Sequence, residues 1–210
     1  MKRLMAVMLA VLMLFFLTAC GGKNEVAVDT GVVEVSDTLV RSVYNEATGS
    51  YSNAYTQITI TPPGDWYTYI DNDLVMAYFK GAVTGDEFAM WSSADYKNKQ
   101  LIPDIAFQDM ATKNNFSVVY VNLEQLEYAE YMDEDTVLSM IIQSFVEQGR
   151  ILQKSGDTVT LGDKEFRFLE FSDMKTSWYI AVKRQDNYAI VLTATDNSGA
   201  GFEMFSSFVG

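Results

Sequence analysis

The feature that most constrains the fold is a series of strand-length runs in the last third of the chain. Each run is rich in β-branched and aromatic residues, and short turns at residues 162–163 and 185–187 separate some of them. Strands joined by turns this short must run antiparallel, because a parallel connection needs a dozen residues or more. The sequence therefore predicts an antiparallel meander of four strands: Thr158–Leu161, Lys164–Phe171, Ser177–Lys183 and Tyr188–Thr195.

An amphipathic helix is predicted directly before the meander, over residues 133–148. Asp133 or Asp135 can cap its first turn, and Gly149 can end it in a left-handed conformation. Because a sheet and a helix must each bury an apolar face, the predicted fold class is a layered α/β (α+β) sandwich. The helical stripe that would face the sheet consists of Val137, Leu138, Ile141, Ile142, Phe145 and Val146.

Residue patterns predict further elements along the rest of the chain. Residues 55–60 and 115–123 alternate as strands do, and the prolines at 62 and 63 end the first of them. A closing helix over residues 198–209 places Phe202, Phe205 and Phe208 on one side. Shorter segments are also predicted: strands at 26–28, 32–35 and 74–79, helices at 37–47 and 86–93, and an apolar piece of undecided structure at 105–110.

Several motifs resemble those of PsbP-like domains, which are named for an extrinsic protein of photosystem II and are common in Gram-positive lipoproteins. The resemblance spans residues 55–209 and implies an αβα sandwich with a mainly antiparallel sheet. It implies no catalytic residue, because that family has no shared one. In photosynthetic relatives such domains bind protein partners and influence metal-ion retention. The motifs are Ile-Thr-Ile-Thr-Pro-Pro-Gly-Asp-Trp (58–66), Leu-Gly-Asp-Lys-Glu-Phe (161–166), Trp-Tyr-Ile-Ala-Val (178–182), Tyr-Ala-Ile-Val-Leu-Thr-Ala-Thr (188–195) and the closing Phe202, Phe205 and Phe208.

The first 22 residues have the pattern of a secretory signal. Lys2 and Arg3 precede an apolar run of 4–17, which is shorter than the roughly 20 residues of a spanning helix. Leu17 is too large for the −3 position of an ordinary cleavage site, and Leu-Thr-Ala-Cys resembles the lipobox of bacterial lipoproteins. That resemblance implies cleavage before Cys20 and lipidation of its thiol. We therefore expect a signal peptide over 1–19, a lipidated Cys and flexible tether over 20–50, and one α/β domain over 51–210.

Charge and composition exclude several classes of function. The net charge is −13, and it becomes −15 once the first 19 residues, with two basic and no acidic side chains, are removed. Such an acidic chain lacks the Lys/Arg clusters that nucleic acids and anionic lipids require. The chain has no His, which excludes His-based triads and His metal ligands. Cys20 is the single Cys, so no internal disulfide can form.

An acidic run is the best candidate for a site, and it has two readings. Clustered carboxylates could bind Ca²⁺ weakly, or they could form a solvated loop and a helix cap. The run lacks the Asp-x-Asx-x-Asx-Gly spacing of a calcium loop, which favours the second reading. The candidate metal ligands are Glu127, Glu130, Asp133 and Asp135, within a run that also holds Glu124 and Glu134.

Two other groups of residues were candidates for a binding or catalytic surface. Aromatic residues at 51, 55, 66, 67 and 69 could form a face for sugars or peptides, or could fill the core. With 28 acidic residues, pairs of carboxylates for glycoside hydrolysis arise by chance, and sequence cannot set their separation.

Together these features predict a non-catalytic, lipid-anchored protein on the outer face of a cell membrane. Its domain would bind an envelope protein, with no cofactor and no nucleic acid. Two alternatives remain open: a small-ligand or cation-binding lipoprotein, and a His-free hydrolase of glycans that uses carboxylates.

Overall fold

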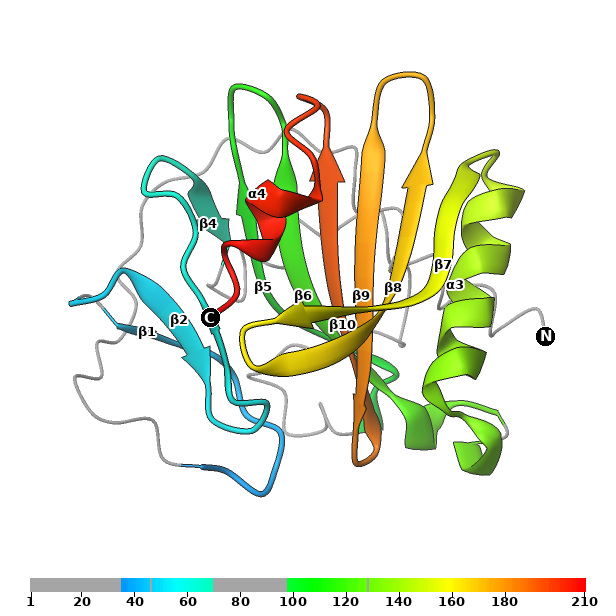
Figure 1. The fold of residues 1–210 in the computed structure, drawn as a ribbon. Helices are drawn as coiled ribbons and strands as arrows, with labels where there is room; N and C mark the ends of the chain where they lie inside the picture. The colour runs from blue at the N-terminus through cyan, green and yellow to red at the C-terminus, as the bar shows by residue number, and fades with distance from the viewer. Residues whose placement is uncertain (1–34, 46, 70–97, 128) are drawn as a thin grey trace.

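Figure 1 shows a computed structural model of the chain, which describes residues 35–45, 47–69, 98–127 and 129–210. The signal peptide, Cys20 and the segments predicted at 26–28, 74–79 and 86–93 lie outside these ranges, as does all but Val35 of the strand predicted at 32–35. Within the ranges, no helix has the length and hydropathy that crossing a membrane requires.

A seven-stranded sheet forms the centre of the domain, and all of its neighbouring strands run antiparallel (Figure 1). The predicted meander and the strand at 115–123 are confirmed, and the apolar piece at 105–110 belongs to a longer strand. The fold class predicted from sequence is therefore confirmed. In spatial order the strands are β4 (Tyr67–Tyr69), β5 (Leu101–Gln108), β6 (Asn115–Asn122), β10 (Tyr188–Asp196), β9 (Ser177–Gln185), β8 (Lys164–Ser172) and β7 (Ile151–Leu161).

Alternating side chains along the strands divide the core into two layers, one on each face of the sheet. On β6, Val119 and Val121 enter the first layer, while Val118 and Tyr120 enter the second. This is the period of two that a pleated strand imposes. Both faces are apolar, so both must be covered by other elements.

Helix α3 (Glu134–Glu147) covers the first face. Asp133 caps it by accepting a hydrogen bond from the backbone N–H of Thr136 at 2.8 Å, and Gly149 follows its end with φ +80°. The ring of Phe145 stacks on Phe171 with the ring centroids 4.3 Å apart. The predicted stripe is correct at five positions, including Ile142, which is half-buried and packs against the first layer, but it is wrong at Val146, which is 52% exposed.

Several short pieces from distant parts of the chain cover the second face. They are a three-stranded antiparallel sheet of β1 (Val43–Asn45), β2 (Ser50–Asn53) and β3 (Ile58–Ile60), the short helix α4 (Phe202–Ser206), and the outer half of the β7–β8 hairpin. Figure 1 shows α4 and the bent hairpin lying across the front of the large sheet. Two 3₁₀ turns, η2 (Leu123–Gln125) and η3 (Ala129–Tyr131), lead from β6 to α3.

Four predictions about the second face need correction. The closing helix is confined to α4 rather than 198–209, because Gly199 and Gly201 hold φ of +77° and +81°. The tether does not extend to residue 50, since Leu39 is only 2% exposed and the chain forms β1 and part of β2 before residue 51. For the same reason, the described residues of the helix predicted at 37–47, which are 37–45 and 47, are not helical. The strand predicted at 55–60 is limited to β3, because Gln57 takes φ +55° in a turn.

The β7–β8 hairpin bends because the pairing of β7 with β8 is interrupted twice. The register shifts between Leu152 and Lys154 and again between Ser155 and Thr158, where Gly156 has φ +83°. Bulges of this kind bend a strand and protect an exposed sheet edge. The tip of the hairpin at Gly162 packs closely against the backbone of Gly210. A Cβ added at Gly162 would lie 2.7 Å from the carbonyl carbon of Gly210.

Candidate functional site

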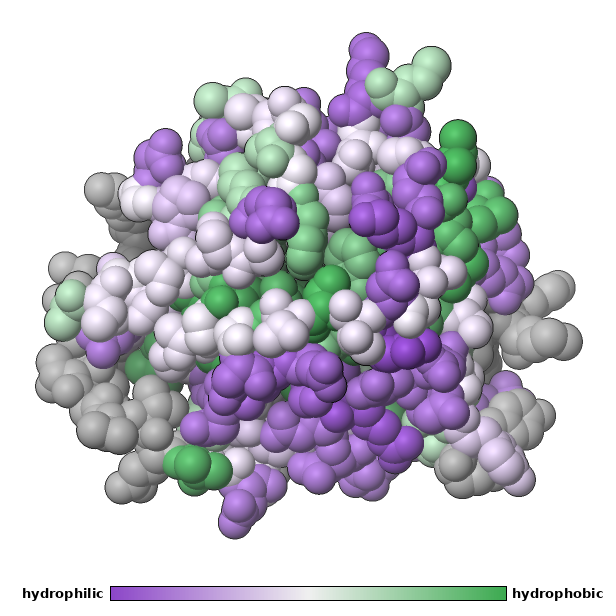
Figure 2. Space-filling model, in the orientation of Figure 1, coloured by the Kyte–Doolittle hydropathy of each residue, from purple (hydrophilic) through white to green (hydrophobic). Residues whose placement is uncertain are grey.

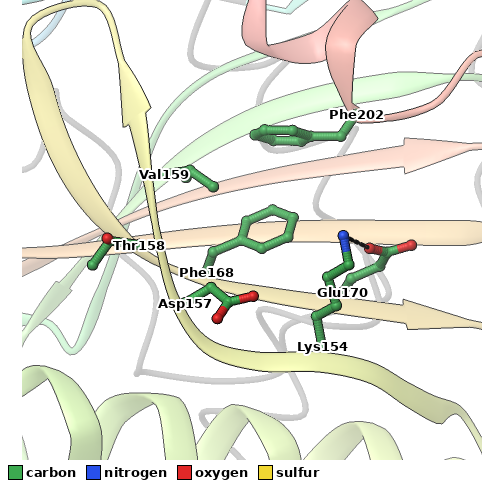
Figure 3. Close-up of a pocket in the computed structure, with 7 residues that line it drawn as sticks. All are labelled: Lys154, Asp157, Thr158, Val159, Phe168, Glu170 and Phe202. Carbon is green, nitrogen blue, oxygen red and sulfur yellow. Dashed lines mark ion pairs between the residues drawn. The ribbon is translucent and has the colours of Figure 1, made fainter.

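An open pocket of about 390 Å³ lies between the bent strand β7 and helix α4. Figure 3 shows its lining side chains coming from β7, β8 and α4, with Val159, Phe168 and Phe202 near one another and Lys154 beside Glu170. The pocket exists because the hairpin bends over the sheet face while α4 is too short to fill the remaining surface. It is lined by Lys154, Asp157, Thr158, Val159, Phe168, Glu170 and Phe202.

The floor of the pocket is apolar and is backed by the second core layer. Phe168 is buried, and its ring lies 4.7 Å from that of Phe202, measured between centroids. The Phe202 ring is half-exposed and also contacts Tyr179, with the centroids 5.7 Å apart. Aromatic rings held in this way offer a preformed apolar surface to a ligand side chain.

Charged and polar groups form the rim. The Nζ of Lys154 lies 3.7 Å from a carboxylate oxygen of Glu170, and the Lys154 side chain is 60% exposed. The exposed side chains of Asp157 and Thr158 add a second carboxylate and a hydroxyl. On this face of the molecule, Figure 2 shows apolar residues in a hollow, with hydrophilic residues gathered below it. An apolar floor with a few polar groups at its edge is the usual composition of a binding pocket.

The loop between β10 and α4 positions Phe202 in the pocket. Asp196 ends β10, and its Oδ1 accepts hydrogen bonds from the backbone N–H groups of Ser198 and Gly199, each at 2.9 Å. Its Oδ2 accepts one from the N–H of Gly201 at 2.8 Å. Burial alone would raise the pKa of Asp196, but the backbone donors outweigh it, so the pKa lies below its ordinary value. The ionised carboxylate therefore holds this loop in shape.

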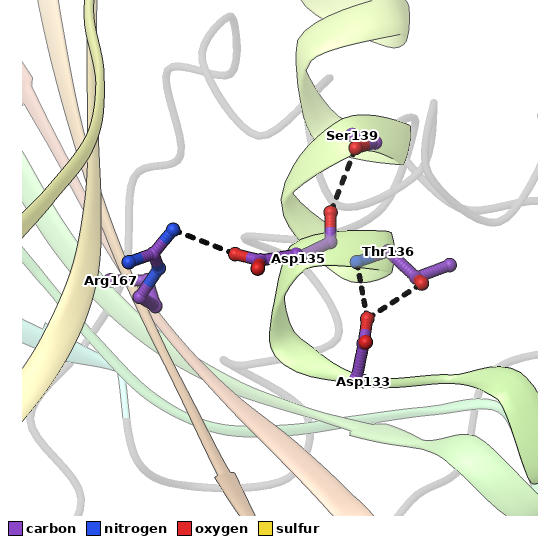
Figure 4. A network of polar contacts seen from close by, with 5 residues as sticks. All are labelled: Asp133, Asp135, Thr136, Ser139 and Arg167. Atoms are coloured by element: carbon purple, nitrogen blue, oxygen red, sulfur yellow. Dashed lines mark hydrogen bonds and ion pairs between the residues drawn. The ribbon is translucent and has the colours of Figure 1, made fainter.

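The acidic run does not come together as a metal site in the structure. Asp133 caps α3, and Asp135 pairs with Arg167 at 2.7 Å (Figure 4). Glu134 accepts a hydrogen bond from the backbone N–H of Arg184. Glu127 is exposed, and the side chain of Glu130 lies outside the description. Among the residues that the structure describes, no group of three or more acidic or Cys side chains is placed to hold a metal ion.

The predicted aromatic face is divided between the two core layers. Tyr67 and Tyr69 pack in the first layer, whereas Tyr51, Tyr55 and Trp66 pack in the second. The Trp66 ring lies edge-on to that of Phe208, with centroids 5.1 Å apart. The core-filling reading of these residues is therefore the correct one.

Sequence reasoning missed the pocket itself. One signal for its shape was Gly156 within a polar, strand-length stretch, since a glycine in a strand often marks a bulge. Another was Phe202, which is predicted to share one side of the closing helix with Phe205 and Phe208 and which packs only partly buried against the second layer. The contact of these two regions joins positions more than 40 residues apart, and no local pattern specifies it.

Comparisons with known proteins give distant structural likenesses. No protein-family model matches the chain, and a search of curated proteins finds no match. The solution structure of cyanobacterial PsbP (CyanoP) from Synechocystis aligns with a TM-score of 0.42 at 15% identity, covering 91% of this chain and 93% of that one. The crystal structure of LpqN, described as involved in cell envelope biogenesis of Mycobacterium tuberculosis, aligns with a TM-score of 0.32 at 14% identity, covering 66% and 69%. Likenesses this distant bear on the fold alone, and nothing about the chain's function follows from them.

Proposed function

We propose that this chain is a lipid-anchored protein of the outer face of a bacterial membrane, and that its α/β domain binds an envelope protein without catalysis. The pocket between β7 and α4 is the binding site in this proposal. The observation that carries the binding function is the exposed part of Phe202, which presents an aromatic ring beside the charged rim of Lys154 and Asp157.

The N-terminal sequence supports the anchor. A cationic start, an apolar run and Leu17-Thr18-Ala19-Cys20 together match a lipoprotein signal. Two acyl chains on the Cys hold a protein to a bilayer, whereas a single chain binds reversibly. Mass spectrometry of the N-terminus of the protein purified from cells tests this directly. We expect a diacylglyceryl group on Cys20, and an unmodified Cys20 or a retained Met1 would contradict it.

Site-specific photo-crosslinking in intact cells tests the binding function. A photoreactive residue at Thr158, on the pocket rim, should give one discrete crosslinked species with a partner protein. The matched control is the same residue at Glu147, which is exposed at the end of α3 on the other side of the sheet. Phe202→Ala should abolish the crosslink from Thr158. Equal crosslinking from both positions, or a Thr158 crosslink that survives Phe202→Ala, would contradict the proposed site.

A small-ligand function is the second candidate, and the pocket volume favours it. A volume of about 390 Å³ falls within the range of roughly 300–1,000 Å³ seen for small-molecule sites. In that case an aromatic or branched small molecule with an ionic group would raise the melting temperature of the wild-type chain but not of Phe202→Ala. Such a shift, without a crosslink at Thr158, would replace the protein partner with a small ligand.

The hydrolase reading can be tested at the same pocket, because two carboxylates line it. Glu170 is engaged by Lys154, while Asp157 is exposed. Release of reducing ends from cell-wall glycans by the purified chain, lost in both Asp157→Asn and Glu170→Gln, would overturn the non-catalytic proposal.

A further inference from the structure

Asp104 is a fully buried acidic residue at an irregular point in β5. The register of β5 with β6 shifts between Pro103 and Ile105, which leaves Asp104 as the extra residue of a bulge. The side chain is 0% exposed. An acidic group is rarely buried in this way unless its hydrogen bonds are satisfied, because removing a charge from water costs several kcal/mol.

Four donors from three separate parts of the chain converge on this carboxylate. Oδ1 accepts from the backbone N–H of Ser42 at 2.9 Å, and Oδ2 accepts from the Ser42 hydroxyl at 2.6 Å. Oδ2 also accepts from the Tyr120 hydroxyl at 2.7 Å and from Nδ2 of Asn53 at 3.3 Å. Asp104 therefore joins the segment before β1 to the end of β2 and to the central strand β6.

Asn53 extends this junction into the backbone of the N-terminal segment. Its Nδ2 donates to the carbonyl oxygen of Val40 at 2.7 Å, and its Oδ1 accepts from the N–H groups of Tyr55 and Thr56, each at 3.0 Å. The described segment is also held by a hydrogen bond from the N–H of Ser36 to the carbonyl oxygen of Ala54 at 3.0 Å and by the packing of Val40 and Tyr44 against the second layer. Leu39 is buried in the second layer, while Val35 is 73% exposed and β1 pairs over only three residues.

Protonation changes what Asp104 can do. Burial raises its pKa above the ordinary value, although the hydrogen bonds from Ser42 and Tyr120 and the charge of Arg41 act in the opposite direction. A protonated carboxyl would place an O–H among groups that now donate to it. Tyr120 can accept a hydrogen bond from that O–H if its own hydroxyl turns to donate to the buried Oγ1 of Thr56.

We propose that Asp104 is a proton-sensitive clasp that fastens residues 35–45 and β2 to the large sheet and allows them to open together. Opening leaves the seven-stranded sheet and α3 folded, because the clasp contacts only the second face. Among the residues that the structure describes, the charged or titratable groups that face Asp104 are Arg41 and Tyr120. Arg41 stays protonated, and Tyr120 also keeps its proton, because burial and the Asp104 charge raise its pKa well above the ordinary value.

The direction of the pH effect follows from linkage. A group with a raised pKa in the closed state binds a proton more readily when closed than when open. The clasp is therefore tightest below the ordinary pKa of an aspartate and loosens as the pH rises through the raised value. If the chain is lipid-anchored as proposed above, opening of residues 35–53 adds about 19 residues, or at most roughly 65 Å, to the reach of the tether. The test below does not depend on the anchor.

Hydrogen exchange of the full chain, followed by mass spectrometry, tests the clasp. In Asp104→Ala, which removes the acceptor of all four hydrogen bonds, we expect amides of residues 36–45 and β2 to exchange about tenfold faster or more. Amides of β9 and β10 should stay within about twofold of wild type. Unchanged exchange, or equal acceleration across both faces, would overturn the proposal.

A second variant keeps the test informative if Asp104→Ala does not fold. Ser42→Ala removes one hydroxyl from the clasp and should give the same local acceleration. Ser52→Ala is its matched control, because that hydroxyl bonds Thr59 at 3.0 Å and not Asp104. The ratio of exchange rates between residues 36–45 and β10 should rise with pH above about 4 in wild type and stay flat in Asp104→Asn. Parallel slopes in the two proteins would contradict a proton-sensitive clasp.

Discussion

The two faces of the sheet are covered in different ways. In the part of the chain that the structure describes, the 14-residue helix α3 packs on the first face against β7, β8 and β9, and its buried residues lie close together in sequence. The second face is covered by the N-terminal segment, a three-stranded sheet, a five-residue helix and a bent hairpin, which come from both ends of the chain. The second face also contains the pocket and the buried Asp104.

This difference indicates that the cover of the first face mainly stabilises the domain, whereas the cover of the second face can change conformation. A continuous amphipathic helix on an apolar face leaves few polar groups to satisfy and no gap to fill. A cover made of short pieces needs polar junctions between them, such as those at Asp104 and Asp196, and leaves space where the pieces do not meet. Regions of low local stability are where binding surfaces and moving elements are usually found.

The largest expected effect is on the first face. Phe145→Ala removes a ring that stacks on Phe171 and lies edge-on to Trp178, so we expect a loss of about 3–5 kcal/mol of unfolding free energy. Urea denaturation followed by circular dichroism measures it. Val146→Ala, at the neighbouring exposed position, is the control and should change stability by about 0.5 kcal/mol or less. A loss below about 1 kcal/mol for Phe145→Ala would contradict the packing of α3.

The next effect tests the hairpin that crosses the second face. Gly162 has φ +61°, and an added Cβ would collide with the backbone of Gly210, whereas Gly149 has φ +80° and open space around it. Gly149→Ala should cost about 1–2 kcal/mol for the left-handed conformation alone. Gly162→Ala should cost about 1–3 kcal/mol more, because the backbone must also shift. Equal losses in the two variants would mean that the hairpin tip does not rest on Gly210.

The loop before α4 should respond to acid. Asp196→Ala leaves three backbone N–H groups without their acceptor, and we expect a loss of about 1–3 kcal/mol at neutral pH. Because the folded-state pKa of Asp196 is lowered, its contribution is complete above the ordinary value of about 3.9 and is lost as the pH falls through the folded-state value. Urea titrations from pH 7 to pH 2 should show a shallower acid-side loss in the variant, and identical profiles would refute this role.

The smallest effect concerns the rim of the pocket. Lys154→Ala removes an exposed ion pair with Glu170, so stability should change by about 0–1 kcal/mol and less at 1 M salt. Crosslinking from Thr158 should nevertheless fall if the rim contacts the partner. A stability loss above about 2 kcal/mol would show that Lys154 supports the fold and is not a residue of the binding surface.

The sequence contained enough information for the elements whose pattern is local. The period of α3, the cap at Asp133 and the short turn at residues 185–187 specify structure within a few residues, and each is confirmed. The second face depends on contacts between distant positions. The bond between Ser42 and Asp104 spans 62 residues, and nothing in the sequence near Ser42 distinguishes a buried junction from a polar tether.

The candidate site shows the same limit. The composition of the acidic run indicated carboxylates but not their partners, and the structure assigns them to a helix cap and an ion pair with Arg167. The pocket forms where β7 bends at Gly156 and α4 stops short, and both features depend on backbone conformation rather than residue type. Sequence patterns specify which residues are apolar, but not where two covering pieces fail to meet.

Native-state hydrogen exchange of the wild-type chain tests the difference between the two faces most directly. Amides of α3 should exchange only through global unfolding, with a strong dependence on added denaturant. Amides of α4 and residues 36–45 should exchange faster, through local openings that denaturant hardly affects. If all three regions exchanged with the same free energy and the same denaturant dependence, the two faces would form one cooperative unit, and the distinction between them would be wrong.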